Sequence, residues 1–179
     1  MSQAQPKKPN KAIERLCGAA SEAWRRQDYP KSISLLEQAI QLEPSNPSLH
    51  LQLAHAHGLR YDYPAVESCI EKALQLSQGR VEMLEEAARI CSPLKNVELM
   101  QGYLERASLK KGVSMDALLS LADLYLLDNR LDGAAELVER AARMDRKDPR
   151  VLLKEAVLKQ QRGQVKEAEP QFRQLMANT

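Results

Sequence analysis

The sequence predicts an all-α protein made of five consecutive helix–turn–helix repeats that stack into a solenoid. Leucine and alanine, both strong helix formers, contribute 27 and 22 of the 179 residues. Glycine is scarce, with 7 residues, which disfavours a β fold with many turns. The chain also matches itself when it is shifted by 34 residues, and a period of this length indicates an array of small structural repeats.

Columns of equivalent residues carry the repeat. One column is alanine throughout and comprises Ala20, Ala54, Ala88, Ala122 and Ala156. A second column comprises Ala39, Ala73, Ala107 and Ala141, with Leu175 in the fifth repeat. A third holds large apolar residues, namely Leu36, Ile70, Leu104, Val138 and Phe172. Because helices approach closely only where a side chain is small, the alanines are expected at helix crossings, with the large residues filling the space beside them.

The period sets the boundaries of the elements in chain order. The repeats span 13–46, 47–80, 81–114, 115–148 and 149–179, after a polar lead-in, 1–12, that is expected to be disordered. About ten antiparallel helices are expected at 13–26 and 30–43, 47–60 and 64–77, 81–92 and 96–110, 115–127 and 131–144, and 149–161 and 165–177.

Turn residues support these boundaries in the first two repeats. Asp28-Tyr29-Pro30 recurs as Asp62-Tyr63-Pro64, where the aspartate caps the second helix of the pair and the proline is tolerated in its first turn. Pro93 is expected to end the first helix of repeat three early. Pro170 lies inside the last helix, where it removes a backbone hydrogen bond, so a kink is expected there.

These residues resemble the tetratricopeptide repeat, a 34-residue helix–turn–helix unit with small residues at positions 8, 20 and 27 and a large one at 24. Counted from Ile13, position 8 is alanine in every repeat, whereas position 20 is looser, with Ser32, Val66 and Met100 in the first three. The resemblance covers residues 13–179, and it implies a right-handed superhelical solenoid with a concave groove.

The sequence offers no catalytic or metal-binding pattern. It has no phosphate-binding loop, dinucleotide fingerprint or nucleophile elbow. His50, His55 and His57 lack a partner cysteine or carboxylate at metal-ligand spacing, and Cys17, Cys69 and Cys91 form no zinc or disulfide pattern. We therefore expect no enzyme activity, no cofactor and no metal. The reduced cysteines, and the lack of an apolar membrane span or signal peptide, favour a cytoplasmic protein.

The resemblance places positions 2, 5, 9 and 12 of each first helix on the concave face. The binding candidates taken from these columns are Cys17, Ser21, Leu51, His55, Glu85, Arg89, Leu119, Asp123, Leu126, Leu153 and Val157. Leu119 and Leu126 exceed what helix stacking needs, so they are expected to form an exposed apolar patch beside acidic residues. That patch would bind a segment of apolar and basic character.

The resemblance therefore implies a non-catalytic scaffold that binds a protein or peptide segment, not nucleic acid or membrane. The near-neutral net charge of +2 lacks the basic excess that nucleic-acid-binding proteins usually show. Two alternatives remain open: an N-terminal array of a larger bacterial enzyme, such as a sulfotransferase or glycosyltransferase, whose C-terminal domain would be the partner, and self-association through an uncapped last repeat.

Two charge patterns bear on the partner. Family members that grip the acidic tails of chaperones use a carboxylate clamp, whose lysine, asparagine and arginine positions here hold Cys17, Ser21, Gln52, Glu82 and Glu86. The two glutamates would repel a carboxylate, so chaperone-tail binding is not expected. Residues 140–166 have nine basic and three acidic side chains, which form either a solvated helix surface or a docking face for an acidic segment.

Overall fold

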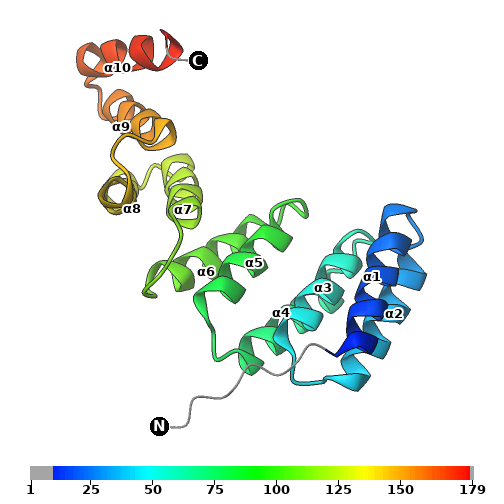
Figure 1. The fold of residues 1–179 in the computed structure, drawn as a ribbon. Helices are drawn as coiled ribbons and strands as arrows, with labels where there is room; N and C mark the ends of the chain where they lie inside the picture. The colour runs from blue at the N-terminus through cyan, green and yellow to red at the C-terminus, as the bar shows by residue number, and fades with distance from the viewer. Residues whose placement is uncertain (1–9, 178–179) are drawn as a thin grey trace. The chain divides into compact units, whose positions relative to one another are not determined.

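The protein is described by a computed structural model, which covers residues 10–177 of the chain. These residues form ten α-helices and no strand, in agreement with the predicted fold class (Figure 1). The helices are α1 (Lys11–Arg25), α2 (Tyr29–Leu42), α3 (Pro47–Gly58), α4 (Tyr63–Leu76), α5 (Val81–Cys91), α6 (Val97–Ser108), α7 (Met115–Leu127), α8 (Leu131–Met144), α9 (Pro149–Gln161) and α10 (Val165–Ala177).

The chain divides into two compact units, residues 1–96 and 97–179. The first unit contains α1 to α5, in which α1 packs against α2, α3 against α2 and α4, and α5 against α3 and α4. The second unit contains α6 to α10, in which each helix packs against the next and α7 also packs against α9. Short turns join the helices of a pair, so paired helices run in opposite directions.

Side-chain caps fix the starts of α2 and α4, each of which begins one residue before its predicted start. Asp28 Oδ1 accepts a hydrogen bond from the backbone N–H of Lys31 (3.3 Å), and Asp62 Oδ1 accepts the equivalent bond from Ala65 (3.4 Å). Each aspartate thereby satisfies a backbone donor that has no partner inside its helix. Proline occupies the first turn of α2, α3, α4 and α9, where its missing N–H costs nothing.

The predicted lead-in is too long. Asn10 caps α1 by accepting a hydrogen bond from the N–H of Ala12 (3.0 Å), so residues 11 and 12 are helical and not part of a disordered segment. The rest of the lead-in, residues 1–9, lies outside the described residues. The two prolines that the sequence analysis singled out lie near α5 and inside α10. The helix α5 ends at Cys91, two residues before Pro93, while α10 continues through Pro170. A kink at Pro170 stays a prediction.

The turn inside each repeat has a left-handed residue that the sequence did not reveal. Gln27, Tyr61, Lys95, Asn129 and Gly163 follow one another at intervals of 34 residues, and all have φ between 54° and 79°. In four of these turns, the backbone N–H of the residue after the left-handed one donates a hydrogen bond to the carbonyl oxygen five residues earlier. Asp28 N–H, for example, donates to Ala23 O (2.9 Å). This is the Schellman ending, in which glycine is the usual left-handed residue.

Because four of the five turns place a side chain in this conformation, glycine is expected to stabilise them. The variant Gln27→Gly is expected to raise the free energy of unfolding by about 0.5–1 kcal/mol, since glycine removes the steric cost of positive φ. The control Gln38→Gly replaces an exposed glutamine inside α2 and is expected to lower it by about 1 kcal/mol. Urea denaturation followed by tryptophan fluorescence measures both, and equal effects of the two variants would contradict the prediction.

Burial confirms the predicted repeat register. The alanines of both columns are at most 3% exposed, and the large residues Leu36, Ile70, Leu104 and Val138 are buried beside them. The fifth repeat departs from the pattern because α10 buries only Ala168, while Phe172 and Leu175 are half-buried. Within the described residues, α10 packs mainly against α9.

In the second unit, a polar cluster joins α6, α7 and the turn before α8. Tyr125 Oη donates to Glu105 Oε1 (2.9 Å), and the Arg130 guanidinium lies 3.7 Å from the Tyr125 ring centroid. Hydrogen bonds from Gln101, and then from Tyr125 and Arg130, lower the pKa of the Glu105 carboxyl. Gly133 lies against the ring, where a Cβ atom would come within 2.7 Å of Tyr125 Cδ2.

Candidate functional site

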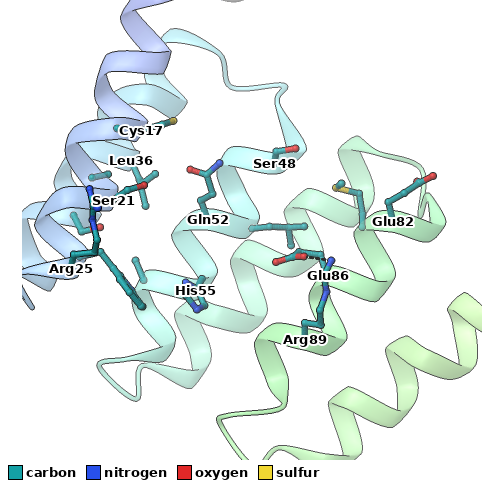
Figure 2. A pocket seen from close by; sticks show the side chains of 17 residues that line it. Cys17, Ser21, Arg25, Leu36, Ser48, Gln52, His55, Glu82, Glu86 and Arg89 are labelled. Atoms are coloured by element: carbon teal, nitrogen blue, oxygen red, sulfur yellow. Dashed lines mark ion pairs between the residues drawn. The ribbon is translucent and has the colours of Figure 1, made fainter. Parts of the chain in front are cut away.

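A groove of about 750 Å³ lies in the first unit, between α1, α3 and α5 (Figure 2). These are the first helices of three consecutive repeats, and α2 contributes only Ser32 and Leu36 to the lining. The 34-residue period brings equivalent positions of successive first helices to one face. The groove is therefore a direct product of the repeat.

The apolar part of the groove is built from small or buried side chains. Leu51, Ala20 and Ala56 are buried beneath its surface, and Met83 is half-buried. The Cys17 thiol also lines the groove, and burial raises its pKa, which keeps it protonated at neutral pH. Cys17 thus contributes a neutral, weakly polar surface.

An aromatic stack lies at one edge of the groove. The rings of Trp24 on α1 and His55 on α3 have centroids 5.5 Å apart and planes inclined by 24°. The indole N–H of Trp24 is buried and has no hydrogen-bond partner among the described residues. Stacking and packing, without a hydrogen bond, therefore hold the only tryptophan of the chain in place.

Charged side chains occupy the two ends of the groove. Figure 2 shows Glu82 and Ser48 toward the N-terminal ends of their helices, and Arg25, His55 and Arg89 toward the C-terminal ends. Arg89 pairs with Glu86 (2.5 Å). Arg25 makes its own pair with Glu22, at 2.6 Å. All these pairs are solvent-exposed, and such pairs contribute at most about 1 kcal/mol, so the arginines can bind other anions.

The groove brings together five of the predicted binding residues and leaves out a sixth from the same unit. Cys17, Ser21, Leu51, His55 and Arg89 line it. Glu85 does not line the groove and is half-buried. The acidic side chains in the lining are instead Glu82, three residues before Glu85 on α5, and Glu86, which directly follows it.

The expected apolar patch on α7 is wrong. Leu119 and Leu126 are 5% and 7% exposed, so they belong to the core of the second unit. The reason is that α7 packs against α6, α8 and α9 and is apolar on nearly every face, which is the pattern of an enclosed helix.

The remaining candidates also lie in the second unit. Leu153 is 41% exposed, and Val157 is half-buried. Asp123 forms an ion pair with Lys154, so its carboxylate is already neutralised. Ion pairs also neutralise basic side chains of residues 140–166. Arg150 pairs with Asp116 and Asp148, and Arg162 pairs with Asp132.

Several residues that line the groove were absent from the predicted set, among them Trp24, Gln52, Glu82 and Glu86. Trp24 and Glu82 occupy positions 12 and 2, which the repeat resemblance places on the concave face. Gln52 and Glu86 occupy position 6, one residue beyond position 5. Because residues three and four apart share a helix face, position 6 lies beside positions 2 and 9.

Over residues 10–177, no three histidine, cysteine or carboxylate side chains gather in a group that could hold a metal ion. Among the helices of the described chain, none is both long enough and apolar enough to cross a membrane. Val165 and Met176 on α10 are exposed, and self-association through this last repeat stays a prediction.

The chain resembles known proteins in sequence and in fold. Residues 101–149 match the sequence profile of the tetratricopeptide repeat. A crystal structure of MamA shares 17% identity, with 93% of this chain and 91% of that chain covered, at a TM-score of 0.71. A tetratricopeptide repeat protein from Parabacteroides merdae shares 19% identity, covering 94% and 67% of the two chains, at a TM-score of 0.77.

A third similar structure is that of YrrB, with 15% identity, 93% and 90% of the two chains covered, and a TM-score of 0.67. YrrB is described as a tetratricopeptide repeat protein with an unusual peptide-binding site. No curated protein matches the chain. The profile match identifies a tetratricopeptide repeat at residues 101–149, and the structural likeness shows that the chain has the fold of a tetratricopeptide-repeat solenoid.

Proposed function

We propose that the chain is a protein-binding module that holds a peptide segment of its partner in the groove between α1, α3 and α5, without performing chemistry. The observation that carries this proposal is the convergence of side chains from three consecutive first helices on one hollow of about 750 Å³. That volume lies within the range of sites that enclose small ligands or several peptide side chains.

The composition of the lining supports a peptide as the ligand. Half-buried Met83 and the Trp24–His55 stack offer apolar surface, with Leu51 buried beneath, while Ser21 and Gln52 are exposed polar side chains. An apolar centre with a polar rim is the usual anatomy of a protein-recognition surface. The fold likeness to YrrB, which is described as having a peptide-binding site, agrees with this proposal.

The proposal predicts that filling the groove abolishes binding. Peptides selected from a random display library on the full-length chain are expected to bind Gln52→Tyr at least about tenfold more weakly than the wild type, because the larger ring fills space in the groove that Gln52 lines. The matched control is Gln38→Tyr, which replaces an exposed glutamine on α2 that does not line the groove. It is expected to retain wild-type affinity.

Affinities are measured by the fluorescence of Trp24, which lies in the groove and is the only tryptophan. Thermal denaturation of both variants verifies that they remain folded. If the selected peptides bind Gln52→Tyr as well as the wild type, the groove is not their binding site and the proposal fails.

A further inference from the structure

We propose that the groove selects extended segments that carry one basic and one acidic side chain about three residues apart, with an apolar side chain between them. This inference rests on the proposed function of the groove and adds the chemistry of its partner. It follows from where the charges lie along the helices and from the surface between them.

The opposite charges of the groove are separated along the helix axes. Glu82 lies at the start of α5, and Arg89 follows seven residues later on the same helix. At 1.5 Å per residue, this separation is about 10 Å. Arg25, near the end of α1, lies toward the same end of the groove as Arg89 (Figure 2). The occupant therefore meets a carboxylate at one end and two guanidinium groups at the other.

Both ends are able to bind an additional charge. Glu82 is exposed and has no hydrogen bond or ion pair to any described residue. Arg25 and Arg89 each have one carboxylate partner, Glu22 and Glu86 respectively. Since a guanidinium group has five N–H donors, one such pair leaves donors for a second carboxylate.

The surface between the charged ends favours an apolar side chain. Leu51 and Met83 line this part of the groove, and the indole of Trp24 borders it. Because no hydrogen bond fixes the indole, an incoming apolar side chain can pack against it without breaking one. Burial of that side chain supplies affinity, while the charged ends supply selectivity.

Charge complementarity excludes segments with a single sign of charge. A purely basic segment would place a cation beside Arg25 and Arg89, and a purely acidic one would place an anion beside Glu82 and Glu86. An extended chain in the polyproline-II conformation has three residues per turn and advances about 3.1 Å per residue, so side chains three residues apart lie on one face and span about 9 Å, close to the required distance. Adjacent charges span only about a third of it.

The test uses synthetic peptides of identical composition, capped at both ends, with one lysine, one glutamate and one leucine in a serine background. Two peptides place the charges three residues apart, one with lysine first and one with glutamate first. Two others place the charges side by side in each order. Titration of the full-length chain, followed by Trp24 fluorescence, gives the affinities.

One of the two spaced peptides is expected to bind about two- to fivefold more tightly than either peptide with adjacent charges, since it satisfies two exposed ion pairs instead of one. The other spaced peptide is expected to be weaker, because reversing the order places each charge beside its like. The preferred order reports the direction in which the chain lies in the groove.

A double variant tests whether Glu82 and Arg89 set this preference. In Glu82→Lys with Arg89→Glu, the preferred order of charges is expected to reverse. The matched control is Glu136→Lys with Arg143→Glu, because it changes the same residue types at the same seven-residue spacing on α8, outside the groove. The control is expected to keep the wild-type preference. Circular dichroism verifies that both variants are folded.

Equal affinity for all four peptides, or the same preferred order in the wild type and the Glu82/Arg89 variant, would overturn the inference and leave the proposed function intact. Failure of all four peptides to bind would also overturn it. The separate comparison of library-selected peptides on Gln52→Tyr and Gln38→Tyr decides the proposed function, so failure of the inference is distinguishable from failure of the proposed function.

Discussion

Replacing Leu121 with alanine is expected to lower the free energy of unfolding by about 2–5 kcal/mol. Leu121 lies on α7 and is 1% exposed, among the most completely enclosed large side chains of the chain. Its truncation loses the transfer free energy of the removed carbons and leaves a cavity between helices of the second unit. A loss of this size is a large part of the stability of an ordinary domain.

Leu127→Ala is the matched control, because Leu127 lies on the same helix and is 82% exposed. This variant is expected to change the free energy of unfolding by no more than about 0.5 kcal/mol. Urea denaturation followed by circular dichroism at 222 nm measures both variants. Since Trp24 lies in the first unit, its fluorescence measured in parallel shows whether both units unfold together. Similar losses for Leu121→Ala and Leu127→Ala would contradict the burial assigned to α7.

The positions of the helices could be predicted because local and long-range signals agree in this chain. The boundaries of α7 to α10 match the prediction because the 34-residue period fixes them, and capping residues such as Asp148 and Ser114 reinforce the helix starts. The start of α1 was missed because no earlier repeat provides a reference for Asn10. Its cap is a purely local feature.

The left-handed turns escaped prediction for a different reason. Glycine is the sequence signal for such a conformation, and only Gly163 provides it, while Gln27, Tyr61 and Lys95 adopt the same φ with a side chain. The positions are recognisable only after the period is known. Tertiary packing of each helix pair holds the turn in place despite its local cost.

The candidate site was predicted best where polar and apolar residues alternate. Ser21 and His55 follow buried alanines on α1 and α3, so the exposed face of each helix is evident. On α7, apolar residues occupy almost every position, and the sequence does not distinguish a leucine in the groove from one between helices. That distinction depends on which neighbouring helices cover α7, which is a property of the assembled repeats.

The alanine column provides the second large expected effect. Ala122 is completely buried where α7 crosses its neighbours, and Ala88 holds the equivalent position on α5 with 3% exposure. Leucine at either site adds three carbon atoms to a close-packed helix crossing, which forces the helices apart or distorts side chains. Ala122→Leu and Ala88→Leu are each expected to lower the free energy of unfolding by about 1–3 kcal/mol.

Ala19→Leu separates this packing effect from any general effect of leucine. Ala19 is an exposed residue of α1, and it directly precedes Ala20, which is the buried member of the alanine column on that helix. It is expected to change the free energy of unfolding by less than about 0.5 kcal/mol, since alanine and leucine are both good helix formers. Urea denaturation of the three variants tests the register directly. A shift of the register by one residue would place Ala19 at the crossing. Destabilisation by Ala19→Leu, with unchanged stability of Ala88→Leu and Ala122→Leu, would therefore disprove the assigned register.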